Sequence, residues 1–308
     1  MRSIDAGCKR KDTILMNEKR KALGALVASM LIFGTIGIFR RYIDLPSSVI
    51  AMMRGFIGTA FLFIFIHLRG QRISLADIRR NLVKLVASGV VMGFNWILLF
   101  EAYRYTSVAT ATLCYYMAPI IMMLVSPVLL GEKLTKKKIV CMLLALIGMI
   151  PVSGVLEAGF HMGEMRGVLL GFGAAVLYAA VVLINKTITD IGAYDKTIVQ
   201  LAAAAIALTP YVLLTENMGS IHLTGLSAAM MLLVGVVHTG FTYALYFGCT
   251  KHLSAQTLAI VSYVDPVVAI LLSAVLLGES MTPLGMAGAV LVLGATLVSE
   301  LPDRHAGN

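Results

Sequence analysis

Two stretches of the sequence align without a gap: GFNWILLFEAYRYTSVATATLCYYMAPIIMMLVSPVLLGEKLT (residues 93–135) and GFTYALYFGCTKHLSAQTLAIVSYVDPVVAILLSAVLLGESMT (residues 240–282), at an offset of 147. Sixteen of the 43 aligned positions are identical, among them a tyrosine, a proline and a terminal Leu-Leu-Gly-Glu motif. Shared composition explains scattered Leu and Val matches, but it does not bring these motifs into one register. The sequence therefore predicts an internal repeat.

The repeat lies within a chain of membrane-like composition. The 308 residues are 59% hydrophobic and 13% charged, whereas soluble domains carry roughly 25% charged residues. A helix needs about 20 residues to span ~30 Å of hydrocarbon, and the apolar blocks reach this length. We therefore predict an all-α integral membrane protein with ten transmembrane helices. The expected spans are residues 22–40, 47–68, 83–103, 107–130, 138–156, 167–185, 196–215, 226–248, 254–277 and 282–300.

Basic residues are distributed unevenly between the connections. If the N-terminus is cytoplasmic, twenty Lys and Arg lie on the inner side and only Arg40, Arg41, Arg104 and Arg166 on the outer side. Such an excess is typical of cytoplasmic connections. We therefore expect a multi-pass protein of the cytoplasmic membrane with both termini in the cytoplasm. The net charge of +9 is interpreted as topology rather than as nucleic-acid binding.

The repeat also determines an orientation. Five predicted spans separate each helix from its copy, and because five is odd, the second half enters the membrane from the opposite side. Inverted repeats allow alternating access, with the substrate site near the midplane where the halves meet. The expected organisation is a basic cytoplasmic tail (1–21), a first five-helix repeat (22–156), an extracytoplasmic connection (157–166), a second, inverted repeat (167–300) and a cytoplasmic C-terminal tail (301–308).

The repeated residues resemble a known family. Residues 101–135 and the copy ending DPVVAILLSAVLLGESMT are similar to the EamA-type branch of the drug/metabolite transporter superfamily. An AL-x-Y-T-S-A beginning, a mid-helix proline and a terminal G-E-x-L are typical there, and the first copy departs from this pattern at Glu101-Ala102-Tyr103. The resemblance covers about residues 20–300. It implies a 5+5 arrangement around a cavity lined by spans 1, 3, 4, 6, 8 and 9, and it names no substrate, because members carry amino acids, nucleotide-related metabolites, amines and drugs.

Asp265 lies within SYVDPVVAI (residues 262–270), about eleven residues into the ninth span. That places it ~16 Å from the inner end of the helix, where a carboxylate is costly and often carries a proton, binds a cation or faces a cavity. Alternatively, it caps backbone groups freed by Pro266, which has no N–H. Its repeat counterpart is Ala118. Pro119 and Pro266 are predicted helix-kink positions.

Aromatic and amide side chains occur in the spans expected to line the cavity. Near a carboxylate, aromatic faces stabilise organic cations, although each ring alone is also an ordinary packing residue. Amides also form hydrogen bonds between helices. The candidates for substrate binding or coupling are Asp265, Trp96, Asn95, Tyr116, Tyr178 and Tyr263.

Glu101 and Arg54 are predicted near the outer ends of the third and second spans. Their depths agree within one or two helical turns. One hypothesis is a gate ion pair that forms in one state of a transport cycle. The other is two separate interfacial charges with snorkelling side chains.

These features favour a secondary active transporter of a small organic metabolite, such as an amine or amino acid. The sequence has no G-x-x-x-x-G-K-[ST] motif, so gradient coupling to protons or ions, or exchange, is expected rather than ATP hydrolysis. No cofactor, metal site or enzymatic cluster is predicted, since the Cys and His residues lack metal-ligand spacing. A channel and a non-transporting scaffold or receptor are the alternatives. The expected partners are the substrate, the lipid bilayer and, through small-residue spacing, a second copy in a homodimer. The sequence leaves open the direction of transport, import or efflux.

Overall fold

The computed structural model describes residues 2–106, 108–152, 155–158, 165–217, 219, 223–277 and 282–301. The elements are α1 (Arg2–Arg40), α2 (Ser47–Leu68), α3 (Leu75–Tyr105), α4 (Val108–Tyr115), α5 (Ala118–Leu130), α6 (Lys136–Val152), α7 (Val155–Ala158), α8 (Met165–Thr187), α9 (Ala193–Thr215), α10 (Gly225–Leu233), the π-helix η3 (Val234–Phe241), α11 (Thr242–Cys249), α12 (Ala255–Val261), α13 (Val264–Leu277) and α14 (Pro283–Glu300). The described part contains no β-strand, and the all-α prediction is confirmed.

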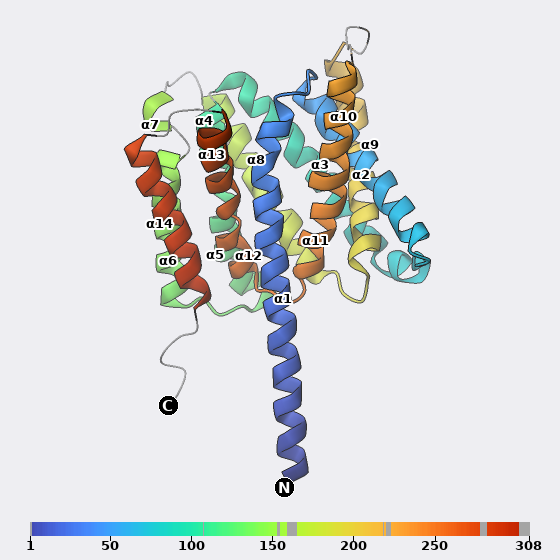
Figure 1. Ribbon diagram of the computed structural model, residues 1–308, viewed down its shortest axis with the longest axis vertical. Coiled ribbons are helices and arrows are strands. Elements are labelled where there is room, and N and C mark those ends of the chain that lie inside the picture. The colour runs from blue at the N-terminus through green and yellow to red at the C-terminus, as the bar shows by residue number, and fades with distance from the viewer. Residues whose placement is uncertain are drawn as a thin grey trace.

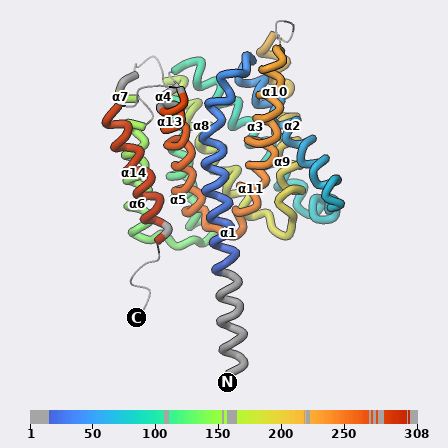
Figure 2. The backbone as a smooth tube through the Cα atoms, in the orientation of Figure 1, coloured from blue at the N-terminus to red at the C-terminus, as the bar shows by residue number. Residues whose placement is uncertain are grey.

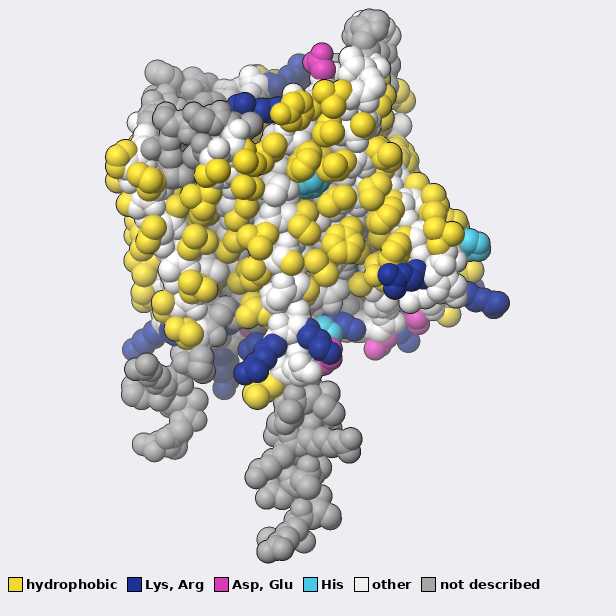
Figure 3. Space-filling model, viewed as in Figure 1, with side chains coloured by type: hydrophobic (Ala, Val, Ile, Leu, Met, Phe, Trp, Pro, Cys, Tyr) yellow, Lys and Arg dark blue, Asp and Glu magenta, His cyan; other side chains and the backbone are white. Residues whose placement is uncertain are grey.

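Seven helical stretches in the described part are long and apolar enough to cross a membrane. The segments Ala255–Ala269 and Pro283–Ser299 are shorter apolar helices. On the surface, hydrophobic side chains cover the flank of the bundle, and charged side chains gather at its two ends (Figure 3). Side chains as exposed as Leu68 (81%) and Leu214 (86%) lie among many other exposed apolar side chains, and large exposed apolar surfaces mark contact with a membrane or a partner. The chain is a multi-pass membrane protein, while its ten-span count stays a prediction.

The helices form one bundle in which α1 begins and α14 ends on the same side (Figure 1). Helix α1 runs between α13 and α11 and contacts both (Figure 2). The predicted first span started at residue 22, whereas α1 begins at Arg2. Helix α3 packs on both α8 and α9.

Small residues and amides hold α3, α8 and α9 together. A Cβ atom added at Gly89 would lie 2.4 Å from the carbonyl oxygen of Gln200, so only glycine permits this approach of α3 to α9. Beside it, the Asn185 side-chain amide donates to the Ser88 hydroxyl (3.0 Å), and Gln200 donates to the Asn185 oxygen (3.1 Å). These contacts lie within one chain; a homodimer stays a prediction.

Two helical segments are interrupted at positions that differ by one residue in the repeat register, so that the equivalent residues Tyr116 and Tyr263 belong to both breaks. The interruption between α4 and α5 lies at residues 116–117, and that between α12 and α13 lies at residues 262–263. Pro119 and Pro266 fall in the first turns of α5 and α13, where a missing N–H costs little. At the predicted kinks, each proline thus follows a two-residue break in the helix. Figure 1 places α4 above α5 but α13 above α12, so the two broken helices run in opposite directions.

Candidate functional site

A cavity of about 210 Å³ lies between α1, α2, α3, α8, α11 and the two broken helices. Its wall is largely aromatic. Among the described residues that line it, Arg54 is the cation and Asp265 the anion. Ligand pockets typically measure roughly 300–1,000 Å³, so this cavity suits a small ligand.

Residues related by the internal repeat meet at this cavity. The rings of Trp96 and Tyr243 pack edge to face with centroids 6.3 Å apart. The sequence related these two positions by register alone, and the structure brings them into contact. Three repeat-equivalent pairs line the cavity: Trp96 with Tyr243, Tyr115 with Ser262, and Ala118 with Asp265. The cavity is therefore built where the two sequence repeats meet.

Asp265 lies in the first turn of α13, directly after the helix break, and is half-buried. The positive end of the helix dipole favours a carboxylate at this position. Within the described ranges its side chain has neither a hydrogen bond nor an ion pair, so the expected alternative of backbone capping finds no contact here. Helix α1 passes close by, since a Cβ atom at Gly34 would lie 2.8 Å from the Asp265 carbonyl oxygen.

Arg54 of α2 lines the same cavity and contacts Trp96 of α3. Its guanidinium carbon lies 4.7 Å from the centroid of the Trp96 ring, a distance at which the ring quadrupole attracts a cation. The Arg54 Nε atom is buried, and no group in the described part of the chain accepts a hydrogen bond from it.

The predicted ion pair between Glu101 and Arg54 is not present. Glu101 instead pairs with Arg104 at 2.9 Å and accepts a hydrogen bond from the Tyr211 hydroxyl. The reason is helical spacing: residues three apart lie on one face of a helix, so Arg104 reaches Glu101 without crossing the bundle. In this structure Arg54 lines the cavity, and a pair with Glu101 in another state stays a prediction.

The other predicted site residues divide into two groups. Trp96, Tyr116 and Tyr178 line the cavity together with Asp265. The Tyr178 hydroxyl lies 3.2 Å from that of Tyr246, at the boundary between the cavity and the side where α1 begins.

Asn95 and Tyr263 instead form hydrogen bonds between helices. Asn95 is 1% exposed and donates to the Ala174 carbonyl at 2.6 Å, which joins α3 to α8. It borders a void of about 30 Å³ rather than the main cavity. Tyr263 is fully buried, and its hydroxyl donates to the Tyr116 carbonyl at 2.8 Å. This bond ties the two helix breaks to each other.

Sequence reasoning did not single out Arg54 or Phe33 as members of the cavity, and it placed Tyr243 in a cavity-lining span without choosing it as a candidate. Tyr243 was identifiable, because it is the repeat counterpart of Trp96. Phe33 packs edge to face on Tyr243 at 5.2 Å. It carried no comparable signal, since the first span has only a weak match in the second half.

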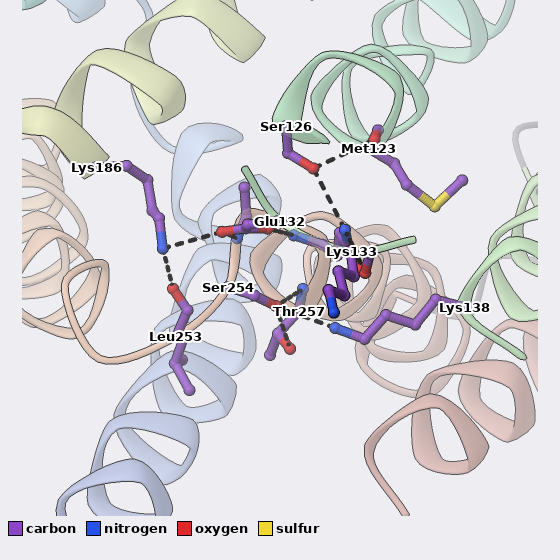
Figure 4. A network of polar contacts seen from close by, with 11 residues as sticks. Met123, Ser126, Glu132, Lys133, Lys138, Lys186, Leu253, Ser254 and Thr257 are labelled. Atoms are coloured by element: carbon purple, nitrogen blue, oxygen red, sulfur yellow. Dashed lines mark hydrogen bonds and ion pairs between the residues drawn. The ribbon is translucent and has the colours of Figure 1, made fainter. Parts of the chain in front are cut away.

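A polar network closes the bundle on the side where α1 begins (Figure 4). The Glu132 carboxylate pairs with Lys186 Nζ at 3.3 Å and accepts hydrogen bonds from the backbone amides of Ala255 (2.9 Å) and Gln256 (3.4 Å). Lys186 also donates to the Leu253 carbonyl. The Leu-Leu-Gly-Glu motif of the first repeat therefore holds the start of α12 in the second repeat.

A second lysine strengthens the same junction. Lys138 Nζ donates to the Ser254 hydroxyl at 3.1 Å, and Ser254 in turn caps α12 by accepting from the Thr257 amide at 3.0 Å. Each copy carries this glutamate, but Glu279 of the second repeat lies outside the described residues.

The comparisons with known proteins agree with this architecture. Residues 20–154 and 165–300 each match the EamA-like transporter family. The chain is 29% identical over 269 residues to the uncharacterized transporter YxxF of Bacillus subtilis strain 168 (86% of this chain, 85% of that protein). It is 26% identical over 281 residues to an uncharacterized transporter of Archaeoglobus fulgidus (89% and 94%), and 26% identical over 204 residues to protein RarD of Salmonella typhi (65% and 66%). A crystal structure with 20% identity superimposes with a TM-score of 0.80 over 91% of this chain and 97% of the other, which shows a shared fold.

Proposed function

Since this chain belongs to the EamA-like transporter family, we propose that it is a secondary active transporter that moves a small organic metabolite across the cytoplasmic membrane by alternating access. An amine or an amino acid is the class of substrate that we favour. The observation that carries the proposal is the cavity at the meeting point of the repeats, bordered by two interrupted helices. Interrupted helices near the midplane are typical of transporter substrate sites.

We further propose ten spans in a 5+5 inverted arrangement. The opposite directions of α4–α5 and α12–α13 support the inversion (Figure 1). The repeat-equivalent pairs around the cavity support it as well, because residues near a two-fold axis lie close to their own counterparts. Exchange of conformations between two such halves would open the cavity to each side in turn.

In this structure, the cavity is closed towards the side where α1 begins. A layer of buried rings, including Tyr246 and Phe247 with centroids 5.5 Å apart, lies between the cavity and that end. The Glu132–Lys186 network lies beyond it. We assign this end to the cytoplasm, because twenty of the Lys and Arg residues belong to it in the predicted topology. The state is then one with a closed cytoplasmic side.

Counterflow in proteoliposomes tests the proposal. Vesicles that contain the purified full-length protein are preloaded with unlabelled pools of amino acids, amines or nucleosides, and uptake of the labelled pool is followed. A carrier accumulates label transiently above equilibrium, and protein-free vesicles do not. A channel equilibrates the label without overshoot, and a scaffold or receptor moves none. Either of these outcomes would refute the carrier proposal. Repeating the assay with a pH or sodium gradient identifies coupling.

A further inference from the structure

We propose that the cavity binds a zwitterion, with the ligand's anionic group at Arg54 and its cationic group at Asp265. This inference rests on the proposed transport function and adds the charge class of the substrate to it.

The first support is that both charges lack a counter-ion. Neither Arg54 nor Asp265 forms an ion pair within the described ranges, either with the other or with a third residue. The Arg54 Nε donor is buried and unpartnered there. Glu101, the acidic residue first expected to neutralise Arg54, is occupied by Arg104 and Tyr211. The Arg54 guanidinium contacts the uncharged Trp96 ring and Tyr243 hydroxyl. Because a charge shielded from water is costly without a counter-charge, a ligand that supplies both missing counter-charges is favoured.

The second support is that the two fixed charges discriminate against ligands of one sign. A cation drawn to Asp265 shares the cavity with the guanidinium of Arg54, and an anion drawn to Arg54 shares it with the carboxylate. Interactions between charges are strong where water is scarce. The Trp96 face, which would otherwise suit an organic cation, is already covered by Arg54 at 4.7 Å. A zwitterion avoids both repulsions.

The third support is the placement of the charges in different halves of the chain. Arg54 belongs to α2 in the first repeat and Asp265 to α13 in the second. A ligand that bridges them therefore touches both repeats. This is the contact that a substrate needs if its binding is to favour the movement of one half against the other. The volume of about 210 Å³ limits the ligand to a small molecule.

The chain contains a reporter for the test, because Trp96 is its single tryptophan and lines the cavity. Intrinsic fluorescence of the full-length protein in lipid nanodiscs is titrated with three matched panels. These are proteinogenic amino acids other than tryptophan together with betaines, the corresponding amines without the carboxylate, and the corresponding carboxylates without the amine. We expect at least some zwitterions to bind about tenfold more tightly than their single-charge analogues, since hydrogen bonds to charged groups have this strength.

Two variants then reverse the preference. With Arg54→Gln, zwitterion affinity should fall about tenfold or more, and the matching amine should bind as well as the zwitterion. With Asp265→Asn, the matching carboxylate should bind as well as the zwitterion. The controls are Arg80→Gln and Asp190→Asn, which remove the same charges from an exposed ion pair of 3.6 Å. Asn also tolerates the left-handed backbone at Asp190, where φ is 56°.

A melting temperature for each variant separates loss of binding from loss of folding. If Arg54→Gln unfolds because it leaves the cavity with an uncompensated negative charge, the double variant Arg54→Gln/Asp265→Asn should recover the fold and still fail to select zwitterions. Amines or carboxylates that bind the wild-type protein as tightly as zwitterions would overturn the inference. The absence of a fluorescence change with all three panels would overturn it as well. Counterflow of an amine pool without zwitterion binding would overturn it and leave the carrier function standing.

Discussion

Replacing Glu132 by Gln should loosen the junction between the repeats. The substitution keeps the size of the side chain but removes the charge that faces Lys186 at 3.3 Å and the amides of Ala255 and Gln256. The Glu132 and Lys186 side chains are only 15% and 14% exposed, so water replaces little of the lost interaction. Hydrogen bonds to charged groups contribute about 1.5–3 kcal/mol. We take about 2 kcal/mol for this cluster, which corresponds to roughly a thirtyfold change in an equilibrium constant.

Hydrogen exchange followed by mass spectrometry measures this change directly. The amides of Ala255 and Gln256 are the hydrogen-bond donors to Glu132, so their exchange reports the opening of the junction. In Glu132→Gln, we expect peptides that cover the start of α12 to exchange roughly thirtyfold faster, in proportion to the open population. Glu18→Gln is the control, because Glu18 forms only an exposed pair with Lys21 at 3.5 Å.

A double-mutant cycle decides whether Glu132 and Lys186 act as one unit. If the ion pair between the two residues stabilises the junction, the effects of Glu132→Gln and Lys186→Gln on exchange should be less than additive. Additivity within about 0.5 kcal/mol, or unchanged exchange at the start of α12 in Glu132→Gln, would refute the reasoning that this network closes the bundle.

Three further substitutions test the packing around the cavity. Gly34→Ala should lower the free energy of unfolding by about 1–3 kcal/mol, because the new Cβ would lie 2.7 Å from a side-chain carbon of α13. The control is Gly37→Ala one turn later, whose Cβ would meet nothing within 4 Å. Equal melting temperatures for the two variants would contradict this reasoning. Tyr263→Phe should lower the free energy of unfolding by about 1–3 kcal/mol, because the Tyr116 carbonyl at the first helix break loses its hydrogen-bond donor. The control is Tyr42→Phe, at a residue that is 51% exposed. An equal loss of stability in the control would contradict this explanation. Asn185→Ala should cost at least as much in thermal unfolding, since it removes the acceptor of the Gln200 amide and the donor to the Ser88 hydroxyl. An unchanged transition would show that water replaces both bonds.

The helices of the bundle were largely predictable, because a lipid-facing helix must be apolar over its whole length. The helix interruptions were less so. Pro119 and Pro266 indicated a disturbance, but a proline constrains the residues before it more than those after it. The interruptions accordingly lie at residues 116–117 and 262–263, and the prolines open new helices instead of bending old ones.

The cavity residues were predictable only where an apolar span contained a polar or aromatic side chain with no local partner. Asp265, Trp96, Tyr116 and Tyr178 satisfied that condition. Arg54 was placed by depth alone, and depth does not give the direction in which a long side chain points around its helix. Asn95 stays a predicted site residue. Its hydrogen bond to a backbone carbonyl of α8 was not predictable, because no sequence pattern identifies a main-chain acceptor on another helix.

The internal repeat offers a physical way to separate residues that support movement from those that select cargo. Two halves that exchange conformations need equivalent contacts in both states, so positions that are identical in the two copies, such as Tyr116 and Tyr263, suit the scaffold. The hydrogen bond between the two breaks has this character. Selection does not need equivalence, because a single ligand occupies the cavity in one orientation. Ala118 and Asp265 are equivalent in the repeat and both line the cavity, yet only one carries charge. We therefore expect the differences between the copies, rather than their similarities, to mark the residues of the proposed substrate site.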